Sequence, residues 1–245
     1  MLRYFHQWGS PPVFHDRAGR MLPWLWLAAA VLILAGLYGG LVRAPADYEQ
    51  GEVYRIIYIH VPGAWVAMFG YVAMATAAAI GLIWRIKVAE VVASAGARAG
   101  ASFTVLALAT GAIWGQPTWG TWWVWDARLT SVLILLFLYL GFIALENAIE
   151  DRRAAARACA ILAIVGVVNI PIIHFSVEWW NTLHQGATVT RFSAPAIHIS
   201  MLVPLLAMAL GCMAFYAAAL LSWSRALLLE RERGSRWAVE RAVRK

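Results

Sequence analysis

Six long stretches of apolar residues constrain the fold of this chain more than any other feature. They cover roughly residues 22–42, 61–84, 91–113, 129–146, 157–176 and 198–223. A helix needs about 20 predominantly apolar residues to cross the hydrocarbon core of a bilayer, and each stretch is close to that length or longer. Because the bilayer interior offers no water to backbone groups, such segments cross it as helices. The pattern predicts an all-α integral membrane protein with six transmembrane helices.

The composition leaves few residues for a soluble domain beside the membrane helices. Apolar residues make up 62% of the sequence and charged residues 13%, against about 45–50% and about 25% in soluble domains. We therefore expect one membrane domain over residues 1–245. Ala44-Pro45-Ala46 is similar to a signal-peptide cleavage site. However, the uncharged stretch before it is longer than the roughly 7–15 residues of a signal-peptide core, so we expect a retained first helix.

The basic residues predict which way the helices face. Fifteen Lys and Arg residues lie in the two terminal segments and in the 85–90 and 147–157 loops, and four lie in the remaining loops. Basic residues accumulate on the cytoplasmic side. We therefore expect both termini in the cytoplasm of a bacterial-type inner membrane, with the 43–60, 114–128 and 177–197 loops outside. The four outward residues are Arg43, Arg55, Arg128 and Arg191. No patterned basic face accompanies the net charge of +7, so we expect membrane lipid and no nucleic acid as a partner.

Polar residues interrupt the apolar stretches at few positions. Arg98 is the only full charge deep within one, and we expect its side chain to extend towards the nearest basic loop. Asn169 and Pro171 interrupt the fifth stretch, where a kink or unwound turn is expected because proline removes a backbone donor. Cys159 and Cys212 form no CxxC pair, no CxxCH motif and no zinc-binding spacing, so we interpret them as buried thiols.

Tryptophan is concentrated in one outward loop. Residues 114–128 read WGQPTWGTWWVWDAR and contain Trp114, Trp119, Trp122, Trp123 and Trp125. One interpretation is an aromatic belt, in which tryptophans lie at headgroup level. A belt, however, spreads its aromatic residues over many helix ends. Five in one loop with glycines favour a local apolar surface for a flat aromatic ligand, since indole faces give large contact area at low entropic cost.

Four histidines lie at or near the outer surface. They are His60, His174, His184 and His198. His60 precedes Pro62 at the expected start of the second helix, because proline favours the first helical position. His184 lies in a polar stretch between the fifth and sixth helices. A single outward histidine is usually solvated or hydrogen-bonded, but two beside an aromatic surface are candidates for metal ligation.

Two arginines and an aspartate complete the candidate site. Arg55 precedes His60, and Arg128 follows the tryptophan run. A guanidinium can bind a carboxylate through two hydrogen bonds, although each arginine alone is equally consistent with a headgroup contact. Asp126 either caps the next helix, orients the tryptophans or pairs with Arg128. Indoles, imidazoles and guanidinium groups together fit a flat, apolar dianion that carries a metal, which describes haem. A quinone would use only the indoles.

These residues also carry a resemblance to a known family. Residues 114–128 resemble the tryptophan-rich WWD signature of a haem-handling protein family. Further segments resemble its cytochrome c maturation protein C branch, also called haem exporter protein C. They are APADY from Ala44, YRIIYIHVP from Tyr54, DRR from Asp151 and VVNIPIIHFSVEWWNTLHQG from Val167. The resemblance covers nearly the whole chain, but residues 187–200 depart from it.

The resemblance implies a function. It implies that His60 and His184 are the axial ligands of haem iron, and that haem is held non-covalently, as b-type haem, on the periplasmic face. The protein would present haem to a periplasmic chaperone, cytochrome c maturation protein E, helped by the small single-helix protein D. An ABC transporter of proteins A and B would then release the loaded chaperone. We expect a delivery protein rather than an enzyme with turnover, and assistance in covalent haem attachment stays open.

Three other classes of protein are alternatives. A b-type cytochrome for electron transfer normally buries paired histidines near mid-membrane, and here no histidine lies at mid-depth. A permease generally has polar or broken helices at the midplane, whereas Asn169 and Pro171 lie nearer the outer end. A purely structural subunit of an ABC transporter complex would leave the tryptophans unexplained.

Overall fold

The computed structural model describes residues 9–186, 189 and 194–243. Over those residues the chain is all-helical, with no β-strand. Six helical segments are long and apolar enough to cross a membrane, so the prediction of six such helices is confirmed. The protein is therefore a multi-pass membrane protein.

The helices follow one another with short connections. In chain order they are α2 (Pro11–Tyr38), the π-helical turn η1 (Gly39–Arg43), the 3₁₀ turn η2 (Glu52–Ile56), α3 (Ile57–Trp84), α4 (Lys87–Trp119), α5 (Ala127–Ala148), α6 (Arg152–Gly166), α7 (Asn169–Trp179), α8 (Ile199–Arg231) and α9 (Arg236–Val243).

Several helices extend beyond the apolar stretches that predict them. At 33 residues, α4 is about 50 Å long, which exceeds a hydrocarbon core of about 30 Å. Trp114 and Trp119 consequently lie on the last two turns of α4 rather than in a loop. Similarly, α3 begins at Ile57, so Pro62 is its sixth residue rather than its first. An apolar stretch indicates only the part of a helix that would contact lipid. The helical hydrogen bonds continue beyond that part, into the region where membrane and water meet.

The expected interruption of the fifth stretch is present. Helix α6 ends at Gly166, two residues form a turn, and α7 begins at Asn169. The Asn169 side chain donates a hydrogen bond to the backbone oxygen of Ser131 in α5 at 2.9 Å. Pro171 lies in the first turn of α7. Backbone N–H groups in a first turn have no hydrogen-bond partner within the helix, so a proline there removes no helical hydrogen bond. The break therefore leaves α7 anchored to α5.

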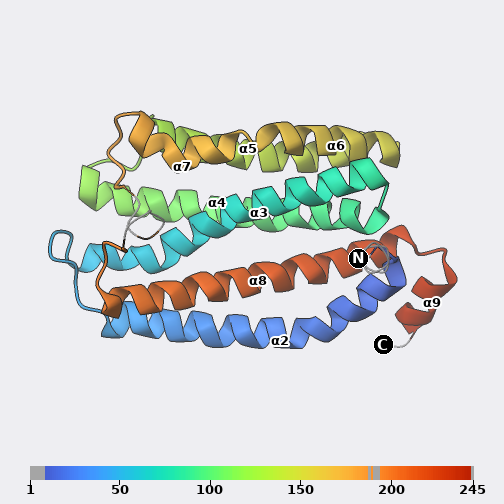
Figure 1. Ribbon diagram of the computed structural model, residues 1–245, viewed down its shortest axis with the longest axis horizontal. Helices are drawn as coiled ribbons and strands as arrows, with labels where there is room; N and C mark the ends of the chain where they lie inside the picture. The colour runs from blue at the N-terminus through green and yellow to red at the C-terminus, as the bar shows by residue number, and fades with distance from the viewer. Residues whose placement is uncertain (1–8, 187–188, 190–193, 244–245) are drawn as a thin grey trace.

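The helices lie side by side along their length (Figure 1). In this view α2 lies along one side and packs against α8, α3 and α4 lie together beyond α8, and α5, α6 and α7 lie along the opposite side. Helix α9 packs against the start of α2, where Arg241 pairs with Asp16 at 2.6 Å. The start of α2 and the C-terminal helix α9 are thereby joined at one end of the bundle.

The Arg98 side chain extends towards the end of α4 that adjoins the 85–90 loop, in the direction that the sequence predicts. Its guanidinium forms an ion pair with Glu146 at the end of α5, with an N···O distance of 3.1 Å. It also donates to the backbone oxygen and the hydroxyl of Ser94, one turn earlier on α4. Glu146 of α5 therefore neutralises this charge.

Candidate functional site

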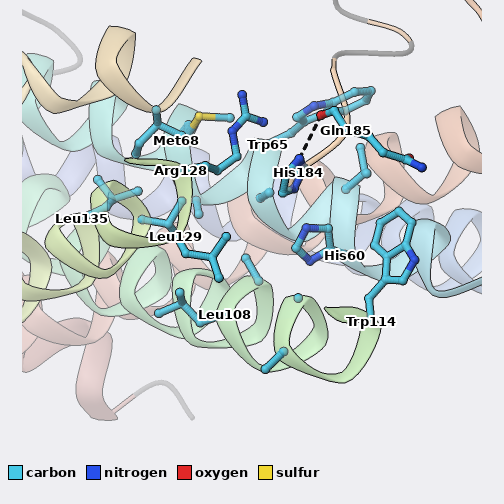
Figure 2. A pocket seen from close by; sticks show the side chains of 18 of the residues that line it. His60, Trp65, Met68, Leu108, Trp114, Arg128, Leu129, Leu135, His184 and Gln185 are labelled. Carbon is cyan, nitrogen blue, oxygen red and sulfur yellow. Dashed lines mark hydrogen bonds between the residues drawn. The ribbon is translucent and has the colours of Figure 1, made fainter. Parts of the chain in front are cut away.

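A pocket opens at the end of the bundle where α3 begins and α4 ends, which is opposite α9 in Figure 1; Figure 2 shows it from close by. It lies between the first half of α3, the last turns of α4, the start of α5, α7, and the segment that carries His184. Its empty volume, counted out to the open mouth, is about 1480 Å³. The cavity itself is about 240 Å³, because the larger volume includes space that is open to solvent. Most of its lining is aliphatic or aromatic.

Two histidines face each other in this pocket. His60 comes from the first turns of α3 and His184 from the segment after α7, and their ring centres are 6.3 Å apart with an angle of 38° between the planes. In Figure 2 the two imidazoles lie one above the other. The tertiary structure therefore brings together two candidate ligands that are 124 positions apart in the sequence.

Hydrogen bonds define the protonated nitrogen of each ring. His184 Nδ1 lies 2.9 Å from the backbone oxygen of Gln185, which can only accept, so Nδ1 carries the proton. His60 Nδ1 lies 3.1 Å from the hydroxyl oxygen of Thr110. That hydroxyl donates its own proton to the Leu106 backbone oxygen at 2.7 Å, so it accepts from His60. Both rings consequently keep the Nε2 lone pair available for a metal ion.

The electrostatic surroundings favour the neutral form of His184. Burial, and secondly the positive charge of Arg128, lower the pKa of His184 below its ordinary value of 6.5. A lowered pKa leaves the ring unprotonated at neutral pH. A neutral imidazole is the form that binds metal ions.

Two tryptophans of α4 contact the histidines. The Trp114 ring meets the His60 ring edge-on at 5.6 Å, and the Trp119 ring lies 6.2 Å from that of His184. Trp114 is held in place from the other side, because its indole N–H donates to Gln50 Oε1 at 2.7 Å. Helix α4 thus presents one indole to each imidazole.

The remaining tryptophans of the run divide into two groups. Trp123 lines the pocket, and its indole N–H has no hydrogen-bond partner among the described residues. Trp122 and Trp125 are absent from the described lining and are 60% and 77% exposed. Gly120, with φ of +76°, ends α4 between Trp119 and this group. Such a left-handed residue favours glycine, and here it separates the helical tryptophans from the loop tryptophans.

The two candidate arginines have different surroundings. Arg128 lines the pocket, where its Nε donates to Ser176 Oγ at 2.9 Å and its Nη2 to the His174 backbone oxygen at 3.1 Å. Arg55 donates instead to the backbone oxygens of Gly40 and Ala44, at 2.7 and 2.9 Å, and is absent from the described lining. Arg55 therefore supports the π-helical turn η1 that follows α2.

Asp126 connects the tryptophan loop to the His184 segment. One carboxylate oxygen accepts from the Leu129 backbone N–H at 2.7 Å, so the predicted helix cap is confirmed. The other accepts from the Thr182 hydroxyl. Thr182 Oγ1 in turn accepts from the backbone N–H of His184 at 3.1 Å. No ion pair between Asp126 and Arg128 is present among the described residues.

Sequence reasoning missed several residues of the pocket. Trp65 of α3 lines it, but a tryptophan in an apolar stretch cannot be distinguished from a lipid-facing one by pattern. Thr110 and Ser176 support His60 and Arg128 from other helices, and no local signal marks them. His174 also lines the pocket, whereas the His198 side chain accepts from Ser200 N–H as the N-cap of α8. Arg191, predicted to lie outside, falls beyond the described residues.

The fold and the site define a multi-pass membrane protein with an aromatic pocket that carries two histidines at one end of its helical bundle. Comparison with protein families identifies the family to which the chain belongs. Residues 4–239 match the family described as Heme exporter protein C, and the chain belongs to that family.

Individual relatives are similar over most of their length. The protein named Heme exporter protein C of Escherichia coli (strain K12) is 50% identical over 240 residues, which cover 98% of this chain and 97% of that protein. The protein of the same name from Haemophilus influenzae is 50% identical over 216 residues, 88% of each chain. That of Bradyrhizobium diazoefficiens is 51% identical over 202 residues, 82% of this chain and 76% of that protein.

Proposed function

We propose that this protein binds haem non-covalently at the periplasmic face of a bacterial inner membrane and delivers it to a haem chaperone during maturation of c-type cytochromes. The name of the relatives, Heme exporter protein C, supports a role in haem export. The observation that carries the proposal is the pair of imidazoles at the open end of an aromatic pocket, each with its Nε2 lone pair available.

The spacing of the imidazoles fits one shared metal ion. A metal–imidazole bond is about 2 Å long in zinc sites, so two imidazoles on opposite sides of one ion have ring centres roughly 6 Å apart. The observed separation is 6.3 Å. His60 and His184 would supply the two axial nitrogens of haem iron. No cluster of three or more His, Cys, Asp or Glu residues that would bind a bare metal ion exists within the described part of the chain.

The rest of the pocket fits the haem periphery. Trp114, Trp119 and Trp123 would contact the macrocycle, as offset or edge-on aromatic contacts do. Arg128 would bind a propionate, because Ser176 and the His174 backbone hold two of its nitrogens and the described residues offer Nη1 no hydrogen bond. Haem held this way lies at the end of the bundle, within reach of another protein.

Delivery requires partners outside this chain. We assign the acceptor role to the periplasmic chaperone, cytochrome c maturation protein E. The small protein D and the ABC transporter formed by proteins A and B complete the proposed assembly. The exposed Trp122 and Trp125 beside the pocket supply contact surface for an incoming protein. Haem bound between two side chains at an open mouth is released once a partner replaces those contacts.

An absorption spectrum of the detergent-purified protein tests haem binding directly. We expect it to co-purify with haem or take up added haem, and to give sharp low-spin bands when oxidised and when reduced, because two nitrogen ligands produce a strong axial field. A protein that holds no haem, or only high-spin haem with an open coordination position, would contradict the proposal.

Orientation is tested separately. We propose that α9 and the first residues of α2 lie in the cytoplasm and the pocket lies outside, since fifteen basic residues flank one side and four the other. A reporter that is active only in the cytoplasm is expected to work when fused after Lys245, and one that is active only in the periplasm is expected to fail there. The opposite result would place the pocket on the cytoplasmic side.

A further inference from the structure

The ring of His60 is held by a residue that the proposed function does not require. Thr110 lies on α4, facing the first turns of α3, and its hydroxyl oxygen is 3.1 Å from His60 Nδ1. Its side chain is 8% exposed, so little water competes for this contact. The backbone oxygen of Leu106 takes the hydroxyl proton at 2.7 Å, which leaves the oxygen as an acceptor towards His60.

Helix α4 also supplies the space for the ring. At Gly111, the residue after Thr110, a Cβ would lie 3.0 Å from His60 Cε1. That distance is shorter than ordinary carbon–carbon contacts of about 3.5–4.0 Å, so a side chain here would displace the imidazole. Thr110 orients the ring by a hydrogen bond, and Gly111 lets it approach the helix.

We propose that Thr110 is a positioning residue for the axial ligand. It holds the proton of His60 on Nδ1 and so presents an unprotonated Nε2 to haem iron. The inference rests on the proposed function, because it concerns the same site. Metal-bound histidines commonly donate their second N–H to such an acceptor, which orients the ring and raises its basicity. His184 has the corresponding acceptor in the Gln185 backbone oxygen.

Three variants separate this role from helix stability. Thr110→Val keeps the shape but removes the hydroxyl, whereas Thr110→Ser keeps the hydroxyl. Thr104→Val is the matched control, because Thr104 lies on the same helix, is fully buried, and donates to the Gly100 backbone oxygen at 2.8 Å without a described contact to a histidine. Both valine variants lose the intrahelical hydrogen bonding of a threonine hydroxyl, but only Thr110→Val changes the surroundings of His60.

Haem binding and the redox spectrum of the bound haem provide the readouts. With added iron protoporphyrin IX, we expect Thr110→Val to lower haem affinity about 10–100-fold, as loss of an outer-shell partner does. The reduction potential should shift to a more positive value, because a weaker donor nitrogen stabilises ferric iron less. Thr110→Ser and Thr104→Val should stay close to the unchanged protein. Equal effects of Thr110→Val and Thr104→Val, or a Thr110→Ser variant as impaired as Thr110→Val, would overturn the proposal.

A measurement on the haem-free protein keeps the inference testable if Thr110→Val does not fold. In the full-length protein labelled with ¹⁵N-histidine, with the His60 signals assigned through His60→Gln, we expect a protonated Nδ1 and an unprotonated Nε2. The reverse tautomer would refute the role of Thr110. This result does not depend on haem, so a protein that bound no haem would refute the proposed function and still leave the tautomer decided.

Discussion

Replacing either His60 or His184 with alanine is expected to abolish low-spin haem binding. Each change removes one of two facing imidazoles whose ring centres are 6.3 Å apart, and leaves one coordination position of the iron open. The loss of affinity should exceed the roughly 10–100-fold cost of removing an outer-shell partner, since a direct bond is lost. Bound haem per protein and the oxidised and reduced absorption spectra measure the effect.

Two other histidines at the same end of the bundle serve as controls. The His174 ring packs edge-on against Phe175 at 4.7 Å, and His198 caps α8. His174→Ala and His198→Ala should therefore change the spectrum less than either ligand variant does, although His174 lines the pocket. Added imidazole should restore low-spin bands to His60→Ala or His184→Ala if a single ligand is missing. A spectrum controlled by His198 and unaffected by His184→Ala would show that the ligand assignment is wrong.

Replacing together the three tryptophans of the 114–128 run that line the pocket is expected to abolish loading of the chaperone. An aromatic contact contributes about 0.5–1.5 kcal/mol beyond area burial. Single changes at Trp114, Trp119 or Trp123 should thus weaken haem binding partially. The triple alanine variant should lose roughly 10–1,000-fold in affinity, because about 1.4 kcal/mol corresponds to a factor of ten. Bound haem and haem-loaded chaperone are measured separately in each variant.

The exposed pair provides the matched comparison. Trp122 and Trp125 belong to the same sequence motif but are 60% and 77% exposed. The double alanine variant should keep its bound haem and low-spin spectrum, while loading of the chaperone falls because the contact surface is lost. If the triple variant left both quantities unchanged, the motif would be an aromatic belt, and the haem proposal would rest on the two histidines and on family membership.

The number of membrane-spanning helices could be predicted from the sequence because it depends on local properties. An apolar stretch about 20 residues long has no stable alternative in a bilayer. The break before Asn169 and the cap at Asp126 were predictable for the same reason, since a proline and a short acceptor side chain act on neighbouring backbone groups. The orientation of the helices also follows from local charge, and it stays a prediction until a reporter measures it.

The tertiary structure decided which members of the motif form the pocket. Helix α4 continues to Trp119 and ends at Gly120, so helical geometry directs Trp114 and Trp119 towards the histidines while Trp122 and Trp125 remain outside. Apolar content marks where a helix meets lipid but not where its hydrogen bonds stop. Residues 114–128 alone therefore do not indicate which tryptophans lie on the helix and which lie in the loop.

Contacts between distant segments decided the rest of the site. Arg55 and Arg128 look alike in sequence, yet one donates to backbone oxygens near the end of the first helix and the other lines the pocket. Thr110 acquires its role because α4 packs against the start of α3. The sequence by itself determined the helices and the residue types available at one end of the bundle. Packing between helices decided which side chains meet, because hydrogen bonds between separate helices leave no local pattern in the sequence.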